Sequence, residues 1–345
     1  MSQTRRTVIA GSFAAGALAR PLAGAAQGAA PSPAMQAVLD YVQGQKTTGF
    51  LIVRDRKTLV ERNWPLPAGP EAEKFKADFT YGQAPDGALL EDVASQQKSF
   101  VSVLLGVAID KGLLDVTRPV SAYVGSGWSK ATPDQEGKIR VIDVMTMSSG
   151  LTEGFAYQAP PGTLFFYNTP VYAVSKAIVA AAARQPLERL THDWLTAPAG
   201  MRETAWRQRP AAFARVGNPT GLVTTPRDTA KFGQIVLDAG RAADGRRIVS
   251  EASLKAMFVR SATNPAYGRF WWLNGGDFVV RPGGARAPGP LIPAAPADLV
   301  AALGAMDRKL YVVPSQKLIV VRMGQATPDR AFDQQLWLRL ARAIG

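Results

Sequence analysis

The sequence contains no cysteine and only one histidine, His192. Without cysteine there is no thiol nucleophile, no thiolate metal site and no disulfide framework. With one histidine, a metal site built on two or three imidazoles is excluded, and a Ser-His-Asp triad would have to use His192. This residue falls on an expected amphipathic helix just before a Pro/Gly turn, which favours a surface or structural role. We therefore expect no metal and no other cofactor.

Three further signals are missing. No G-x-S-x-G motif, the usual sign of an α/β-hydrolase, occurs in the chain. No basic helix or nucleic-acid motif accompanies the formal net charge of +13, whose residues are scattered along the sequence. No apolar run is long enough to cross a membrane. We therefore expect no nucleic-acid partner, no membrane span and no obligate protein partner.

The first residues have the order of an export signal. Arg5 and Arg6 precede an apolar stretch rich in glycine and alanine, and an A-x-A sequence ends at Ala25. This pattern is typical of a signal peptide, and the twin arginines favour the Tat route. Removal of residues 1–25 would take away three of the thirteen net positive charges, Arg20 included, and leave +10. The mature protein is then expected in the periplasm or outside the cell.

Strand-like segments gather at the two ends of the chain. The 345 residues, 47% hydrophobic and 19% charged, are enough to bury a substantial core. Residues 49–64 and 309–324 each read as a pair of strands, the second pair joined around 314–317. Amphipathic helices are expected outside these strands, at 32–45 and 333–345.

Between these ends lies a helix-rich middle. Helices are expected at 98–112, 169–186 and 225–240. This order predicts an α/β (α+β) fold with one antiparallel sheet, assembled from 35–90 and 240–345 and flanked by N- and C-terminal helices. An all-α domain, 91–239, is inserted between the two parts and carries the candidate nucleophile described next. The cleft between sheet and insert is the expected ligand site.

Ser95 and Lys98 lie three residues apart at the start of the apolar segment 98–112. On a helix this spacing puts both side chains on one face. Serine keeps its proton at neutral pH and needs a base, and a lysine can serve when burial disfavours its ammonium form. Spacing alone leaves a second interpretation open, in which Ser95 caps a helix and Lys98 is a surface lysine.

The segment 93–124 resembles the nucleophile region of the serine β-lactamase/penicillin-binding-protein superfamily. The likeness is closer to the class C β-lactamase-like branch, which includes family VIII carboxylesterases and 6-aminohexanoate-oligomer hydrolases. It continues in the family's order through 138–151, 161–178, 221–241 and 309–324. The resemblance implies a β-lactamase-like fold, which agrees with the arrangement expected above.

By this resemblance Ser95 matches the family nucleophile, Lys98 its partner, and Tyr167 the tyrosine that relays protons between nucleophile, lysine and leaving group. A neighbouring ammonium favours the phenolate, so we expect the pKa of Tyr167 to be lowered. The family's Y-x-N motif reads Tyr167-Asn168-Thr169 here. Either the hydroxyl of Thr169 replaces the family amide, or Asn168 reaches into the substrate site.

The family's third motif, K-T-G or H-x-G, falls at 302–304, where the sequence is Ala-Leu-Gly and the cation is missing. Arg308 in the next turn either offers a substitute cation or is a surface arginine. The resemblance implies that the oxyanion hole uses the backbone N–H groups of Ser95 and of Ala305, which follows Gly304. Gly304 would then be required for close backbone approach, or would be an ordinary turn glycine.

Trp271 and Trp272 are expected on opposite faces of one strand, so that at most one lines the site and the other lies in the core. The resemblance implies an exported serine hydrolase that cleaves an ester, a small amide or a peptide-like substrate through a Ser95 acyl-enzyme. The missing cation favours esters or small linear amides over β-lactams. The alternatives are a penicillin-interactive D,D-peptidase or weak β-lactamase acting on cell-wall peptides, and a non-catalytic binding protein of the same fold.

Overall fold

The computed structural model describes residues 31–214 and 216–345. The predicted leader, residues 1–25, lies outside these described residues. Within the described ranges, none of the helices combines the length and the apolar character that a membrane crossing requires.

The large sheet combines strands from both ends of the chain, as predicted. Its six antiparallel strands follow the order β2-β1-β12-β11-β10-β7, and Leu51 in β1 lies opposite Val321 in β12. Strands β11 and β12 are buried along their whole length, which explains their runs of β-branched residues. The strands are β1 (Thr47–Arg54), β2 (Lys57–Asn63), β7 (Trp272–Leu273), β10 (Val300–Gly304), β11 (Arg308–Val313) and β12 (Leu318–Gly324).

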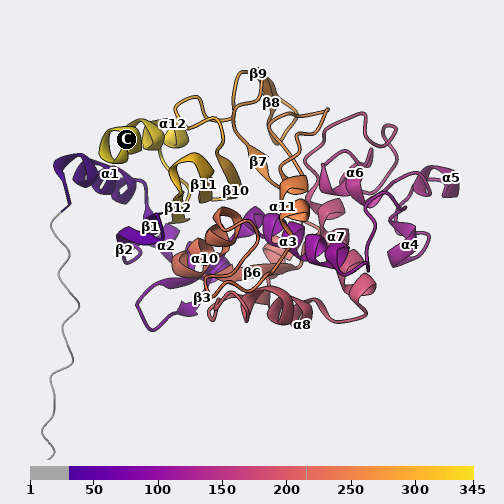
Figure 1. Ribbon diagram of the computed structural model, residues 1–345, viewed down its shortest axis with the longest axis horizontal. Helices are drawn as coiled ribbons and strands as arrows, with labels where there is room; N and C mark the ends of the chain where they lie inside the picture. The colour runs from indigo at the N-terminus through magenta and orange to yellow at the C-terminus, as the bar shows by residue number, and fades with distance from the viewer. Residues whose placement is uncertain (1–30, 215) are drawn as a thin grey trace, which may run out of the picture.

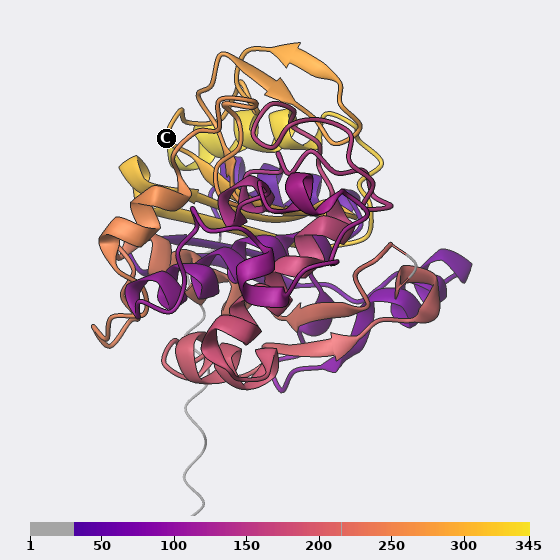
Figure 2. The same cartoon turned by 90° about the vertical axis from the view of Figure 1, so that its right-hand side faces the viewer.

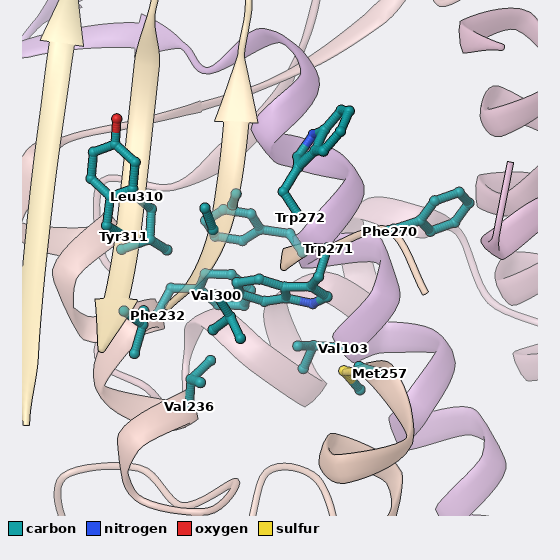
Figure 3. Packing of buried hydrophobic residues seen from close by; sticks show 14 of the residues in the cluster. Val103, Phe232, Val236, Met257, Phe270, Trp271, Trp272, Val300, Leu310 and Tyr311 are labelled. Atoms are coloured by element: carbon teal, nitrogen blue, oxygen red, sulfur yellow. The ribbon is translucent and has the colours of Figure 1, made fainter. Parts of the chain in front are cut away.

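Helices cover both faces of this sheet. Helix α1 (Pro33–Gly44) and helix α12 (Phe332–Ile344) lie side by side on one face (Figure 1). Neighbouring residues of β11 show the alternation: Tyr311 packs on Trp337 of α12, with ring centres 5.6 Å apart, and Leu310 points the other way, toward α10 (Pro226–Leu237) (Figure 3).

A second, four-stranded sheet lies on the opposite side of the molecule from α12 (Figures 1 and 2). Its order is β3-β4-β6-β5, and Asp92 of β4 pairs with Val223 of β6. The segment 91–239 was predicted to be an all-α domain, but in the structure it supplies strands to this sheet as well as helices. The strands are β3 (Thr80–Gln83), β4 (Leu89–Asp92), β5 (Ala205–Gln208) and β6 (Thr220–Thr224).

The other elements are mostly short. A small hairpin consists of β8 (Phe278–Val280) and β9 (Arg286–Pro288). The long helices of the middle segment are α3 (Gln97–Asp110) and α7 (Thr169–Ala183). The remaining helical segments are α2 (Pro70–Phe79), η1 (Ala94–Gln96), α4 (Ser121–Val124), α5 (Pro133–Glu136), α6 (Val141–Met145), α8 (Leu187–Thr191), η2 (His192–Thr196), α9 (Ala211–Ala214), α11 (Glu251–Met257) and η3 (Pro314–Gln316).

Trp271 joins the large sheet to the helical part. Its side chain is fully buried and stacks on Phe232 of α10, with ring centres 5.7 Å apart. Figure 3 shows both rings packed close to Val103 of α3. A tryptophan in this position fixes α3, and hence the residues that precede it, against the sheet.

Candidate active site

Ser95 lies in a tight turn between the end of β4 and the start of α3. The preceding residue, Ala94, has a positive φ of 50°, a backbone conformation that residues other than glycine adopt only at a cost in free energy. Asp92 Oδ1 accepts the backbone N–H of Ala94 at 2.8 Å. Arg209 in turn donates to both oxygens of Asp92, at 2.6 and 2.9 Å, and both side chains are buried. This buried pair holds the turn that presents Ser95.

Lys98 lies one turn along the helix, with 2% of its surface exposed. Its Nζ donates to Ser95 Oγ at 2.9 Å and to Thr169 Oγ1 at 3.3 Å. Burial, followed by the charges of Arg209 and Lys176, holds the pKa of Lys98 well below its usual value. Within the described chain no carboxylate forms an ion pair with this amine. An amine whose charged form is disfavoured in this way is suited to accept the proton of Ser95.

Tyr167 has the opposite pKa shift from the one predicted. Burial raises the pKa of Tyr167 to about 12, and a hydrogen bond with Ser95 opposes this rise only in part. The prediction assumed a charged lysine beside the ring, 4.8 Å from Lys98 Nζ, whereas the site favours the neutral amine. At neutral pH Tyr167 is therefore a phenol that can donate a proton rather than a phenolate base.

Thr169 and Asn168 point to different places. Thr169 is the first residue of α7, and its hydroxyl faces Lys98. The side chain of Asn168 is buried and engaged with the backbone: its Oδ1 accepts the N–H of Val171 at 3.1 Å and its Nδ2 donates to the carbonyl of Leu151 at 2.9 Å. Asn168 caps a helix and its side chain is occupied by the backbone, whereas Thr169, the other candidate, presents its hydroxyl to Lys98.

The end of β10 lies against the nucleophile turn. A Cβ added at Gly304 would lie 2.3 Å from the carbonyl oxygen of Val93 and 3.4 Å from the backbone nitrogen of Gln96. Glycine is required here for close approach rather than for a turn. Ala305, the next residue, is exposed. The residues predicted to form the oxyanion hole therefore lie on two segments that touch.

Arg308 matches neither of the two interpretations of the sequence. It is fully buried and forms an ion pair with Glu91, Nη2 to Oε2 3.3 Å, and its guanidinium lies 4.6 Å from the ring centre of Phe79. It is neither a surface arginine nor free to bind a substrate carboxylate. Since Ala302 stands where the third motif has its lysine or histidine, β10 carries no cation at that edge of the site.

Aromatic rings back the site. Trp272 stacks on Tyr167 with ring centres 5.9 Å apart, and Tyr267 packs edge-on against both. Trp271, on the other face of the strand, belongs to the core. The predicted division of the two tryptophans between site and core is what the structure has, and the phenol ring is held by packing on two sides.

His192 lies on the surface, with 69% of its side chain exposed, and its Nδ1 contacts Asp193 at 2.8 Å. It borders a hollow of about 660 Å³ that contains none of the predicted site residues. No group of acidic and histidine side chains suited to a metal occurs in the described part of the chain.

Two residues of α7 were missed at the level of sequence. The ring centre of Tyr172 lies 4.6 Å from Lys98 Nζ, and Lys176, four residues further, is also buried. The sequence did contain a signal, because Lys176 lies at the centre of an otherwise apolar helix. A lysine in such a position either faces solvent or is buried at an energetic cost that is typical of functional sites.

Solved structures of other proteins share this fold, whereas the comparison with curated proteins gave no match. Among solved structures, a protein assigned as a beta-lactamase from Bacteroides dorei has a TM-score of 0.67 and 14% identity, over 90% of this chain and 98% of its own. A protein assigned as a 6-aminohexanoate-dimer hydrolase from Bacillus anthracis has 0.64 and 17%, over 89% and 80%. A beta-lactamase from Mycobacterium bovis has 0.62 and 15%, over 89% and 99%.

At these identities the neighbours establish a β-lactamase-like fold, as predicted, with mixed helices and antiparallel sheets. The sequence profile of the family described as Beta-lactamase matches residues 34–343, which is nearly the whole described chain. The chain therefore belongs to the Beta-lactamase family.

Proposed function

We propose that this protein is a serine hydrolase that cleaves ester or small amide bonds through an acyl-enzyme on Ser95. The observation that carries the proposal is the buried amine of Lys98, 2.9 Å from Ser95 Oγ and without a carboxylate ion pair among the described residues. A surface lysine near a helix cap would be charged and hydrated. A buried, neutral amine is suited to accept a proton.

The reaction runs in two halves. Ser95 Oγ attacks the carbonyl carbon while its proton passes to Lys98 Nζ, and the backbone N–H groups of Ser95 and Ala305 bind the oxygen that becomes negative. Tyr167 donates its phenolic proton to the leaving oxygen or nitrogen and regains one from Lys98. Water then attacks the acyl-enzyme and gives up a proton to Lys98; the bond between the acyl carbon and Ser95 Oγ breaks, Oγ takes up that proton, and the acid is released.

The proposed substrate class follows from the lack of an available cation on β10. Ala302 stands at the cation position of the third motif, and Arg308 is paired with Glu91. A substrate carboxylate would therefore find no partner on β10, which favours neutral esters and small linear amides. We place the protein in the class C-like branch beside family VIII carboxylesterases and 6-aminohexanoate-oligomer hydrolases. The relatives assigned as beta-lactamases make a D,D-peptidase or weak β-lactamase the second candidate.

Two covalent probes test the proposal on the purified chain. A fluorophosphonate and a fluorescent penicillin are incubated separately with the protein and with Ser95→Ala, and labelled peptides are mapped by mass spectrometry. We expect fluorophosphonate on Ser95, no label on the variant and no stable penicillin adduct. Stable penicillin labelling would favour the second candidate. Absence of any label between pH 7 and pH 9 would refute the hydrolase and favour a binding protein.

A further inference from the structure

Lys176 is a second buried lysine, on helix α7 and outside the proposed catalytic group. It is 7% exposed, and its Nζ donates to Asn218 Oδ1 at 2.5 Å, to the Thr220 carbonyl at 2.8 Å and to Thr220 Oγ1 at 3.0 Å. These acceptors are neutral. No carboxylate lies within ion-pair distance of Lys176 in the ranges that the structure describes, so its charge is stabilised by these dipoles and by the ring of Trp206, whose centre lies 4.7 Å from Nζ.

The two buried lysines share one aromatic ring. Lys98 Nζ lies 4.6 Å and Lys176 Nζ 5.8 Å from the centre of the Tyr172 ring. The two nitrogens are therefore no further apart than the sum of these distances, 10.4 Å. The Tyr172 hydroxyl is buried and has no hydrogen-bond partner in the described chain. A buried ring in contact with both amines provides little screening of a charge on either of them.

A third basic residue, Arg209, also acts on the charge of Lys98. It repels a proton on Lys98 more strongly than Lys176 does. However, Asp92 accepts two hydrogen bonds from Arg209, and this buried carboxylate offsets the guanidinium charge at longer range. The charge of Lys176 has no such partner.

The other titratable groups that face the pair leave this balance unchanged at neutral pH. Burial raises the pKa values of Tyr167, Tyr172 and Tyr267, so all three phenols are uncharged. Arg209 also opposes a proton on Lys176, and Asp92 favours one, as does the solvent-exposed Glu188 at the start of α8.

We propose that Lys176 is a positioning residue that favours the uncharged form of Lys98 by placing a second positive charge beside the Tyr172 ring that both amines contact. The inference rests on the proposed function, in which Lys98 must be neutral to accept the proton of Ser95. Two unit charges no more than 10.4 Å apart at an effective dielectric constant of about 20 shift a pKa by about one unit or more. The inference concerns how easily Lys98 loses its proton, and Lys176 itself does not touch substrate.

The direction of the effect follows from the charge of Lys176. Burial lowers the pKa of Lys176 to about 7, so that it carries its proton over the acid range. In that range it opposes a proton on Lys98. Removing the charge of Lys176 should raise the pKa of Lys98 and move the acid limb of the reaction to higher pH.

The first test is the rate of Ser95 labelling by a fluorophosphonate between pH 5 and pH 9. Lys176→Met and Lys176→Gln should move the midpoint of the acid limb upward by about one pH unit, with about tenfold slower labelling on the limb and an unchanged plateau. Lys176→Gln keeps a donor for Asn218 and Thr220, which covers the case that the methionine variant does not fold. Lys176→Arg should retain the wild-type midpoint.

Lys111→Gln is the matched control, since it removes the same charge from an exposed residue at the end of α3, about 20 Å along the helix from Lys98. It should leave the midpoint unchanged. The inference is overturned if folded Lys176→Met and Lys176→Gln keep the wild-type midpoint, or if Lys111→Gln moves it as far.

A second measurement separates this inference from the proposed function. In protein labelled with ¹³C at the lysine ε-carbons, the Lys98 signal is assigned by its loss in Lys98→Met and then titrated. Lys176→Gln should raise the midpoint of that signal by about one unit even if Ser95 labels with no probe. An unchanged Lys98 midpoint would overturn the inference while leaving the hydrolase proposal intact.

Discussion

Lys98 lies where its charged form is destabilised. The side chain is 2% exposed, two tyrosine rings lie within 5 Å of its Nζ, and its hydrogen-bond acceptors are the hydroxyls of Ser95 and Thr169. A residue chosen for stability alone would be apolar here, because the amine must be desolvated on folding. Such a cost is typical of a site that requires a perturbed pKa.

Lys98→Met should therefore stabilise the protein while it abolishes the activity. We expect ester hydrolysis to fall by at least about 10³-fold, the range for loss of a general base, and the melting temperature to rise by about 2 °C or more. Calorimetry and a short-chain ester assay measure both. Lys255→Met, on an exposed residue of α11, is the control and should change neither. Retained turnover, or a lower melting temperature, would contradict this account of Lys98.

The stability difference should also depend on pH. Lys98 has its ordinary pKa of 10.5 in the unfolded chain and a much lower pKa in the fold, so unfolding takes up a proton at pH values between these two pKa values. The stability of the wild-type protein then rises as the pH rises toward 10.5. The advantage of Lys98→Met should shrink between pH 7 and pH 10.

At this scale the sequence predicts which residues meet but not what surrounds them. The three-residue spacing brings Ser95 and Lys98 together, as expected. The pKa of Tyr167 was expected to fall and instead rises, because its sign depends on burial, which a local pattern does not contain. Arg308 was left open because its partner, Glu91, is more than two hundred residues away in the chain.

Helix α7 positions the site through its first turn. Asn168 caps the helix, and Thr169 presents its hydroxyl to Lys98. Thr169→Val should slow Ser95 labelling by about tenfold, the effect of one lost hydrogen bond, with little change in the free energy of unfolding. Asn168→Ala should lower the free energy of unfolding by about 1 kcal/mol through loss of the cap. Labelling kinetics and urea unfolding separate the two effects, and a stability loss in Thr169→Val with unchanged labelling would contradict these roles.

The contact between β10 and η1 depends on a glycine. In Gly304→Ala the new methyl group would meet the carbonyl oxygen of Val93, so the strand end must move away from Ser95. We expect about a 10²-fold loss of ester hydrolysis, because a displaced oxyanion donor loses most of its effect. Gly44→Ala is the control, since a Cβ there meets nothing within 4 Å. Equal activities of the two variants would place the oxyanion hole elsewhere.

Long elements were predictable and short ones were not. The helix at 32–45, the apolar helix after Ser95 and the hairpin at 309–324 all have a clear periodicity, and the structure contains them. The small sheet has no such local signal. Its two strand pairs, β3–β4 and β5–β6, are joined by the pairing of Asp92 in β4 with Val223 in β6, about 130 residues apart in the chain.

At the scale of the molecule, the site forms where two parts of the chain meet. Ser95 comes from the middle segment, whereas Gly304 and Ala305 come from a sheet that also contains β1 near the N-terminus. The pairing of β1 with β12 closes that sheet late in synthesis, since both ends of the chain must be present. The strand end that carries Gly304 is therefore part of a sheet that is complete only when β1 has paired with β12.

We propose that the chain is exported and that its export depends on Arg5 and Arg6. The wild-type protein should be recovered from the periplasm or medium with its N-terminus near residue 26, as intact-mass spectrometry of cell fractions would show. Arg5→Lys combined with Arg6→Lys keeps the charge but removes the paired guanidinium groups, and should leave the precursor in the cytoplasm. Arg20→Lys serves as the control and should be exported normally. If the double variant is exported and cleaved like the wild type, the twin arginines are not the export signal.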